Sequence, residues 1–390
     1  MSGPEIVTLG CRMNLAESER IRGFLGQEDV VVINSCAVTN EAVRQTRQAI
    51  RRARRTRPDA RLLVTGCAAE TERQHFASMP EIDGLVANDR KLDPRAWNLP
   101  DPGHAIANRK TRAFIPIQTG CDHACTFCII PQGRGRSRSR TVEQVVREAD
   151  RHMDAGAAEV VLTGVDVTSW GHDLPDAPPL GLLVRTLLDQ LPSLDRLRFS
   201  SLDGIEIDPL LEELIASEPR VMPHLHLSLQ HGHDLILKRM KRRHSRSDAI
   251  ALVERLRARR PDLAVGADLI AGFPTETDEH HQANRAIVRE LEIVHGHIFP
   301  YSPRHDTPAA RMPQVDRATV KQRAAELRED VSQVRSAWLE RQIGREAKVL
   351  AEKDGYGHAE NFSRIALPAE TQAGTIVTVR PHRIEKGILI

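Results

Sequence analysis

The sequence has few aromatic residues and no long hydrophobic run. Phe, Trp and Tyr make up 3% of the 390 residues, so aliphatic side chains must fill most of any core. No stretch approaches the about 20 apolar residues of a membrane span, and no secretory signal opens the chain. We therefore expect a cytoplasmic protein without a membrane partner. With 40% hydrophobic residues, the chain has enough apolar surface for two or three folded domains.

Cysteine is also scarce, with six residues in the chain. Because cytosolic thiols stay reduced, six cysteines indicate metal or redox chemistry rather than disulfides. They form two sets. The close set, spaced C-x3-C-x2-C, is Cys121, Cys125 and Cys128, and the dispersed set is Cys11, Cys36 and Cys67.

Basic residues are clustered although the net charge is only +2. Residues 44–57 contain seven arginines, and "GRGRSRSR" at 133–140 contains four. Clustered cations favour a polyanion such as nucleic acid, although charge runs are also common on solvated helix faces. The predicted RNA contacts are Arg47, Arg51, Arg54, Arg134 and Arg136.

The first hundred residues alternate apolar strand patterns with amphipathic helix patterns, which predicts a parallel α/β sheet. Cys11, Cys36 and Cys67 each follow a predicted strand, in "EIVTLGC", "DVVVINSC" and "ARLLVTGC". Parallel strands present their carboxyl ends at one edge of a sheet, so we expect these three cysteines to meet there. The alternative is three unrelated cysteines buried in the core.

A second alternating series begins at "AFIPIQTG" and continues through strand patterns at 159–165, 196–201, 224–230, 264–273 and 294–302. Six βα units predict a partial (β/α)6 barrel with the close cysteine set just after its first strand. Short β-like segments follow Gly344 and predict a small all-β module. The Pro-rich stretch 91–110 reads as a linker. The expected domains are 1–107, 108–342 and 343–390.

The close cysteine set offers only three thiolates to a metal. A structural zinc site needs four ligands, and His123 could be the fourth. A [4Fe–4S] cluster normally takes four cysteines, so three would leave one iron without a protein ligand. Such an open iron could bind a substrate or cofactor.

The motif "GCDHACTFCIIPQGRGRSRSR" resembles the cysteine loop of the radical S-adenosylmethionine (SAM) superfamily. "TLGCRMNLAESE", "INSCAVTNEA" and "VTGCAAE" are similar to the N-terminal cysteine motifs of the methylthiotransferases within that superfamily. "HLHLSLQHGHDLILKRMKRRHS", "DLIAGFPTETDE" and "FPYSPRHDTPAARM" are similar to their later barrel motifs. The segment from Gly344 resembles the RNA-binding TRAM module. The resemblance covers nearly the whole chain.

This resemblance implies two [4Fe–4S] clusters, one on each cysteine set, each with an open iron. The iron of the close set would chelate SAM, whose reductive cleavage gives a 5′-deoxyadenosyl radical, and the second cluster would carry or donate sulfur. A reductant such as flavodoxin or ferredoxin and a sulfur donor are then required. The residues that the resemblance places near SAM are Thr163, Gly164, Ser228, Gln230, Gly272 and Thr275.

Motif details resemble most closely the branch that modifies N6-threonylcarbamoyladenosine in tRNA, beside the anticodon. The product would carry a methylthio group on adenine carbon 2, and the threonylcarbamoyl carboxylate would suit cations near Arg134, Arg136 or Arg304. Asp166 departs from the family pattern, in which histidine is frequent, and "CAAE" lacks the usual aromatic. The alternatives are methylthiolation of N6-isopentenyladenosine in tRNA or of a ribosomal-protein aspartate, and an iron–sulfur redox sensor that binds RNA.

Overall fold

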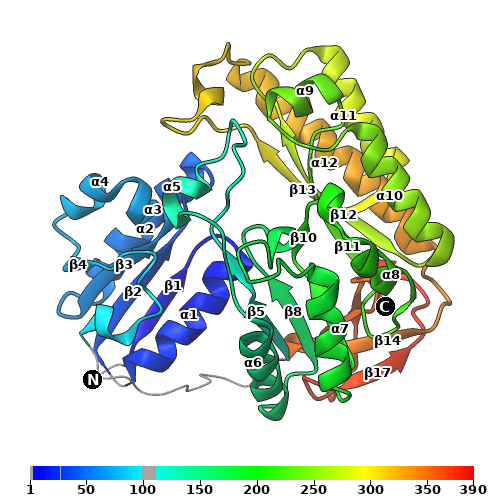
Figure 1. The fold of residues 1–390 in the computed structure, drawn as a ribbon, viewed down its shortest axis with the longest axis horizontal. Helices are drawn as coiled ribbons and strands as arrows, with labels where there is room; N and C mark the ends of the chain where they lie inside the picture. The colour runs from blue at the N-terminus through cyan, green and yellow to red at the C-terminus, as the bar shows by residue number, and fades with distance from the viewer. Residues whose placement is uncertain (1–2, 27, 99–110) are drawn as a thin grey trace.

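A computed structural model of the chain describes residues 3–26, 28–98 and 111–390. Figure 1 shows a parallel sheet with helices on the left, a larger arc of strands and helices, and a small C-terminal sheet at the lower right. Within the described residues, every helix is too short or too polar to cross a bilayer.

The N-terminal sheet contains four parallel strands in the order β1-β2-β3-β4. The strands are β1 (Glu5–Thr8), β2 (Val30–Ser35), β3 (Arg61–Gly66) and β4 (Gly84–Leu85), and the helices are α1 (Arg12–Leu25), α2 (Asn40–Thr56), α3 (Cys67–Thr71) and α4 (Arg73–Ala77). Val31 and Ile33 pack on the side of α2, whereas Val32 packs on the side of α1. Because helices cover both faces, β2 is buried along its whole length, and its first four residues are a continuous apolar run rather than an alternating pattern.

The segment after β4 differs from the prediction at its start. Lys91 and Trp97 are each 1% exposed, and the Trp97 indole donates a hydrogen bond to the Lys91 carbonyl at 2.9 Å. A short helix, η1 (Pro94–Trp97), carries this contact. The predicted linker therefore cannot begin at residue 91. The expected domain boundary at 107/108 lies outside the described residues.

The central region is the predicted partial barrel. Its strands are β5 (Arg112–Pro116), β8 (Glu159–Thr163), β9 (Leu197–Phe199), β10 (Ser201–Leu202), β11 (His224–Gln230), β12 (Ala264–Ala271) and β13 (Ile293–Pro300). All neighbouring pairs are parallel, and only Ser200 separates β9 from β10, so the strands form one six-position arc. The prediction of a (β/α)6 architecture is thus confirmed.

Helices line the outside of this arc (Figure 1). They are α6 (Val142–Asp154), α7 (Leu180–Gln190), α8 (Pro209–Ser217), α9 (Asp234–Arg239), α10 (Arg246–Arg259), α11 (Asp278–Glu290) and α12 (Arg317–Glu340), with short turns η2 (Val167–Ser169), η3 (Gly204–Glu206) and η4 (Pro308–Arg311). Leu225, Leu227 and Leu229 of β11 belong to the core beneath these helices. Since side chains alternate along a strand, His224 and His226 point to the inside of the barrel.

The C-terminal segment forms a six-stranded, mostly antiparallel sheet, so the prediction of an all-β module is confirmed. Its strands are β14 (Ala347–Ala351), β15 (Tyr356–Ala359), β16 (Arg364–Ala366), β17 (Ile376–Val379), β18 (Ile384–Glu385) and β19 (Ile388–Leu389), with a turn η5 (Lys353–Gly355). The order is β17-β14-β15-β16-β19-β18, and β16 with β19 is the parallel pair.

This sheet closes the end of the barrel at which the strands begin. The Phe362 ring stacks on His224 of β11 at 4.9 Å and lies 5.0 Å from the Arg198 guanidinium. Arg198 donates a hydrogen bond to the Ala359 carbonyl, and Arg196 donates to the Lys348 carbonyl. The cysteine loops lie at the opposite end of the barrel, where the strands finish.

Candidate iron–sulfur and substrate site

The dispersed cysteines gather at one edge of the N-terminal sheet. Cys11 caps α1, Cys36 follows β2, and Cys67 begins α3. A Cβ on Gly10, which has φ +93°, would lie 2.7 Å from the Cys36 Sγ, so glycine is needed beside that thiol. Burial, and then the neighbouring Cys11 and Cys67, raise the pKa of Cys36 to about 11. The structure therefore brings this set together, as the strand ends predicted.

Two buried cations lie close to this set. Lys91 Nζ is 2.5 Å from a Glu17 carboxylate oxygen, and Arg134 Nη1 is 2.8 Å from the other oxygen. Both cations also act electrostatically on Cys67. One carboxylate faces two cations, so a surplus of positive charge lies beside the thiols at the edge of the sheet. Arg134 is 7% exposed, and the RNA contact predicted for it does not fit this buried position.

The close set lies in the loop between β6 (Gln118–Thr119) and α5 (Ile130–Arg134), beside β7 (Arg138–Ser139). A Cβ on Gly120, with φ +76°, would lie 1.9 Å from the Arg136 carbonyl oxygen, so the loop requires glycine. The His123 amide donates to Cys121 Sγ at 3.4 Å, and Arg242 approaches Cys125 Sγ at 3.8 Å. Burial raises the pKa of Cys121 to about 12 and that of Cys128 to about 11.

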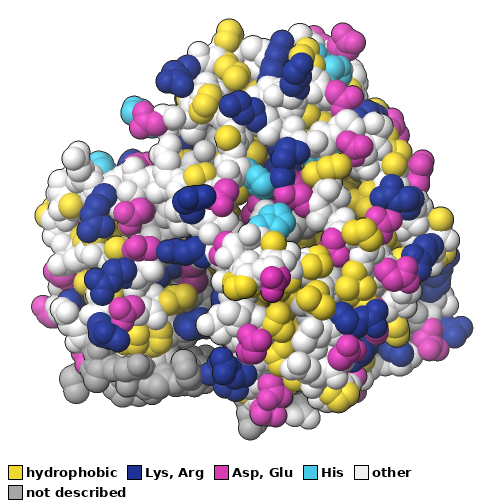
Figure 2. Space-filling view, in the orientation of Figure 1, with side chains coloured by type: hydrophobic (Ala, Val, Ile, Leu, Met, Phe, Trp, Pro, Cys, Tyr) yellow, Lys and Arg dark blue, Asp and Glu magenta, His cyan; other side chains and the backbone are white. Residues whose placement is uncertain are grey.

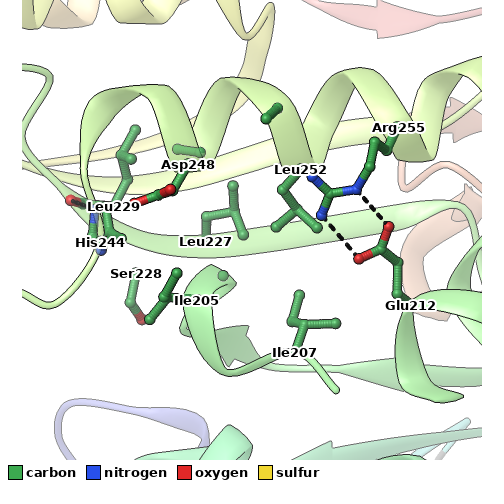
Figure 3. Close-up of a pocket in the computed structure, with 13 residues that line it drawn as sticks. Ile205, Ile207, Glu212, Leu227, Ser228, Leu229, His244, Asp248, Leu252 and Arg255 are labelled. Atoms are coloured by element: carbon green, nitrogen blue, oxygen red, sulfur yellow. Dashed lines mark hydrogen bonds and ion pairs between the residues drawn. The ribbon is translucent and has the colours of Figure 1, made fainter. Parts of the chain in front are cut away.

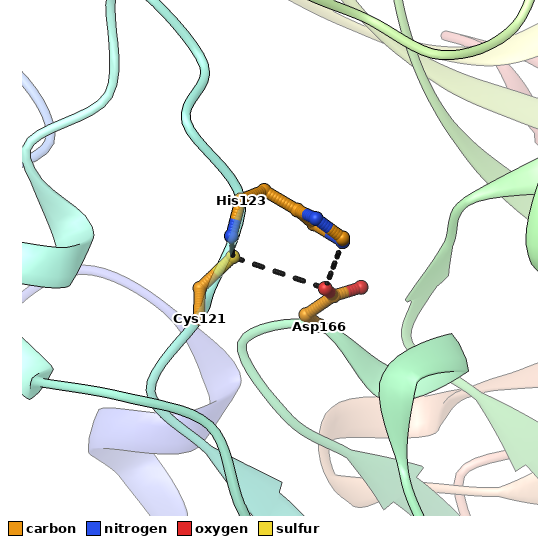
Figure 4. Close-up of side chains that lie close together, drawn as sticks. All are labelled: Cys121, His123 and Asp166. Carbon is orange, nitrogen blue, oxygen red and sulfur yellow. Dashed lines mark hydrogen bonds and ion pairs between the residues drawn. The ribbon is translucent and has the colours of Figure 1, made fainter. Parts of the chain in front are cut away.

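His123 interacts with acids beside this loop (Figure 4). Its Nε2 lies 2.6 Å from the Asp166 carboxylate and 3.6 Å from that of Glu206. Hydrogen bonds that His123 donates to Asp166 and then to Glu206 raise the pKa of His123 to about 10, so the ring is protonated at neutral pH. This pairing gives a role to Asp166, the residue that departs from the family pattern.

The two sets face each other where α3 packs on α5. A Cβ on Gly133 would lie 3.3 Å from the Cys67 Cβ, and Asn88 donates a hydrogen bond to the Gly133 carbonyl. Cys67 also contributes to the electrostatic environment of Cys128. All six cysteines are free thiols. Two groups of three thiols, with nearby cations, suit iron–sulfur clusters bound through three cysteines.

A pocket opens between the loops that carry the two sets, and we call it the central pocket. It is lined by Val38, Thr39, Phe127, Gln230, Asp268, Ile270, Phe299, Pro300, Tyr301 and Ser302. Val38 lies two residues after Cys36, and Phe127 immediately precedes Cys128. Aromatic and aliphatic walls with a few polar groups suit a planar, partly polar ligand.

The residues predicted to contact SAM are dispersed. Gln230, in the left-handed region at φ 67°, lines the central pocket, whereas Thr163 ends β8 and Gly164 follows it. Gly272 packs against Val320, and the Thr275 hydroxyl accepts a hydrogen bond from Arg239 at 2.8 Å. Their SAM contacts remain predictions.

Ser228, the remaining residue predicted to contact SAM, borders a different hollow, which Figure 3 shows. That hollow lies against α10 and is lined by Ile205, Leu227 and Leu252. Arg255 and Glu212 form an ion pair at its rim, with Nε and Oε1 2.9 Å apart. The hollow contains no cysteine, and we assign the reaction site to the central pocket instead.

The α2 arginines that were predicted to contact RNA form ion pairs with acidic side chains of the protein. Arg47 Nη2 lies 2.7 Å from Glu72, and Arg54 binds Asp83 at 2.6 Å as well as three carbonyls. Arg51 lies 3.7 Å from Glu81. Arg136 is exposed, with Asp122 at 3.4 Å. The face in Figure 2 likewise intersperses basic with acidic side chains.

Two other α2 arginines, Arg52 and Arg55, are exposed and make no ion pair with any described residue. They line a groove beside the edge strand β1. The arginine-rich pattern marked the helix, but it could not separate these free cations from Arg47 and Arg54, because the acidic partners come from distant segments.

Comparison with known proteins supports the site. Residues 115–285 match the radical SAM superfamily, and residues 4–87 match a family described as uncharacterized protein family UPF0004. The threonylcarbamoyladenosine tRNA methylthiotransferase MtaB of Rickettsia prowazekii is 43% identical over 99% of this chain and 96% of its own. The Bacillus subtilis protein of that name is 33% identical over 96% of this chain and 92% of its own.

A further relative bears a different name. The tRNA-2-methylthio-N(6)-dimethylallyladenosine synthase of Paracoccus denitrificans is 32% identical over 90% of this chain and 86% of its own. Among solved structures, the radical SAM methyltransferase TsrM of Kitasatospora setae shares the fold, with a TM-score of 0.53 at 16% identity over 75% of this chain and 66% of its own.

The arc of six strands and the close cysteine set are those of a radical SAM protein, a class that uses a [4Fe–4S] cluster and SAM. Within this class, the N-terminal sheet and the relatives that match nearly the whole chain identify the family. The chain belongs to the radical SAM methylthiotransferase family.

Proposed function

We propose that this protein transfers a methylthio group to carbon 2 of N6-threonylcarbamoyladenosine in tRNA, next to the anticodon. The observation that carries the proposal is the similarity, over 99% of the chain, to a relative named for this activity. The arrangement of two cysteine sets around one pocket supports it, because the reaction joins sulfur delivery to carbon activation.

The proposed cofactors are two [4Fe–4S] clusters and SAM. Cys121, Cys125 and Cys128 would hold one cluster, and Cys11, Cys36 and Cys67 the other. When bound, these groups supply the radical, the methyl group and the sulfur that the reaction needs. The protein's own part is to hold the two sets in register and to position the base between them.

The central pocket is the proposed position of the adenine. Phe127, Phe299 and Tyr301 offer ring faces and edges for stacking, and Phe299 is 36% exposed. A base in the anticodon loop is single-stranded and can be turned out of its stack without opening a duplex. The walls therefore suit a flipped base.

Further partners follow from the reaction. A reductant such as flavodoxin or ferredoxin and a sulfur donor are required, and we place the reaction in the cytoplasm. Arg52 and Arg55 are the proposed phosphate contacts, because they are the exposed α2 arginines without acidic partners among the described residues. An RNA contact from the C-terminal sheet, expected from its TRAM resemblance, would lie at the far end of the barrel.

The test compares three substrates with the anaerobically reconstituted enzyme, SAM, a reductant and sulfide. These are tRNA with N6-threonylcarbamoyladenosine, tRNA with N6-isopentenyladenosine, and the small-subunit ribosomal protein. Methylthiolation of the first is expected. The similarity to the Paracoccus denitrificans synthase makes the second the main competitor, and turnover of only that tRNA would reassign the substrate. RNA binding without 5′-deoxyadenosine release would instead support the redox sensor.

A further inference from the structure

The Arg12 side chain points into the barrel, and no carboxylate among the described residues pairs with it. Arg12 follows Cys11, begins α1, and lies with its guanidinium 6.0 Å from the Phe114 ring of β5. Throughout residues 3–26, 28–98 and 111–390, its side chain has no hydrogen-bond acceptor and no carboxylate at ion-pair distance. The Arg12 guanidinium therefore enters the space beside the dispersed cysteine set without a neutralising carboxylate among the described residues.

Other cations inside the barrel are neutralised. Arg112 lies 2.8 Å from Glu159, and Arg198 lies 3.0 Å from the same carboxylate. A half-buried guanidinium without an acceptor is unfavourable, so the arrangement favours an anion supplied by a ligand.

A second acid that acts on Arg12 is also occupied. Asp268 of β12 acts electrostatically on Arg12, yet its Oδ1 lies 3.1 Å from His226 Nε2 and 3.1 Å from His297 Nδ1. Asp268 also lines the central pocket. The His297 side chain is 60% exposed, and because its Nδ1 faces Asp268, its Nε2 is free to meet a ligand. Arg12 and His297 thus both lie near Asp268.

We propose that Arg12 binds the carboxylate of the substrate's threonylcarbamoyl group, with His297 as a second polar contact held by Asp268. The inference rests on the function proposed above and identifies the determinant of substrate choice within it. A carboxylate neutralises the unpaired guanidinium, whereas an isopentenyl group would leave it half-buried and unpaired. Charged pairs of this kind give specificity mainly by penalising the ligand that lacks the charge.

This assignment replaces the cations expected from the sequence. Arg304 is 4% exposed and lies 3.2 Å from Glu72, and Arg134 is bound to Glu17. Arg136 is exposed beside Asp122, on the surface of the cysteine loop. None of these three offers an unpaired guanidinium inside the barrel.

The test uses two synthetic anticodon stem-loops. One carries N6-threonylcarbamoyladenosine and the other its threonine amide, which has the same shape without the charge. Wild-type protein, Arg12→Gln, Arg12→Lys and the same-helix control Arg22→Gln are compared by Kd and by kcat/KM for methylthio formation. The wild type and Arg22→Gln should prefer the acid by on the order of 100-fold. Arg12→Gln should lose this preference, and Arg12→Lys should keep part of it.

The comparison of acid with amide separates substrate binding from indirect effects. An Arg12→Gln variant that loses activity equally on both RNAs would show that Arg12 acts through Cys11 or the fold, and would overturn the inference. Equal wild-type Kd values for acid and amide would also overturn it. If the wild type binds the acid preferentially but methylthiolates neither RNA, the proposed function fails while the carboxylate site stands.

Discussion

Arg134 donates hydrogen bonds to both carboxylate oxygens of Glu17, at 2.8 and 3.0 Å, although 117 residues separate them. Arg134 ends the helix after the close cysteine set, and Glu17 lies on the helix that follows Cys11. Arg134 also donates to Asn14 at 2.6 Å. This buried contact joins the two cysteine-bearing regions and holds them in register.

Replacing Arg134 should therefore destabilise the protein. Arg134→Gln leaves the buried Glu17 with Lys91 alone, and loss of one partner of a buried pair costs about 3 kcal/mol in free energy of unfolding. Denaturant titration of the anaerobic protein measures this change. Arg136→Gln, at an exposed position two residues away, should change stability by less than about 0.5 kcal/mol. Equal stability of the two variants would contradict a joining role for the Arg134–Glu17 pair.

Iron content should divide between the two cysteine sets. Reconstituted wild-type protein should hold about eight irons, as two cubes of four. Replacing Cys121, Cys125 and Cys128 together by Ala should leave about four, and so should replacing Cys11, Cys36 and Cys67. Iron and sulfide analysis, with circular dichroism to confirm folding, checks both. Full iron content in a folded variant without the dispersed set would exclude a cluster there.

Single cysteine variants should separate cleavage of SAM from product formation. Cys128→Ala should abolish release of 5′-deoxyadenosine, because the close set can no longer hold its cluster. Cys36→Ala should retain part of that release and form no methylthio product. Chromatography of 5′-deoxyadenosine and of digested tRNA measures the two outcomes. Equal loss of 5′-deoxyadenosine in two folded variants would contradict this division.

The exposed arginines of α2 should contribute to tRNA affinity. Arg52→Gln combined with Arg55→Gln should weaken binding and reduce the slope of log K against log salt by about one unit per lost phosphate contact. Arg44→Gln, on the same helix but at a position bridged to Glu41, should have a smaller effect. Fluorescence anisotropy at several salt concentrations gives the slopes. An unchanged slope in the double variant would make this face of α2 a solvated surface.

The Phe362 ring should stabilise the barrel from outside it. Phe362→Ala removes its stacking with His224 and His358 and its contacts with Arg112 and Arg198. We expect a loss of about 2 kcal/mol in free energy of unfolding for this half-buried ring. Ile376→Ala, at a 37% exposed position of the same sheet, should cost less than half as much. Similar losses for both variants would contradict the closing role of Phe362.

Local patterns were sufficient to predict the scaffold. The apolar run of β2 and the cysteine after it predicted a buried parallel strand and its ligand at the sheet edge, because both depend on neighbouring residues. The predicted barrel strands also agree with the structure, because the alternation of each strand with an amphipathic helix is visible in the local sequence.

The roles of individual cations could not be predicted in this way. Arg134 and Arg52 both lie in arginine-rich runs, yet one is buried on Glu17 and the other faces solvent. Which of them is free depends on acids contributed by distant segments. The Asp268 pair with His226 and His297 was missed for the same reason, because its members come from three strands and no short motif contains them.

The seal that Phe362 forms has a consequence for how the protein is made. The ribosome synthesises residues 347–389 after every strand of the barrel, so Arg198 and His224 cannot be covered until this sheet has been made. The barrel therefore closes, at the end where its strands begin, only after its own strands are complete. A frameshift at the start of this segment would leave the Arg198 guanidinium without its Ala359 acceptor and its Phe362 contact.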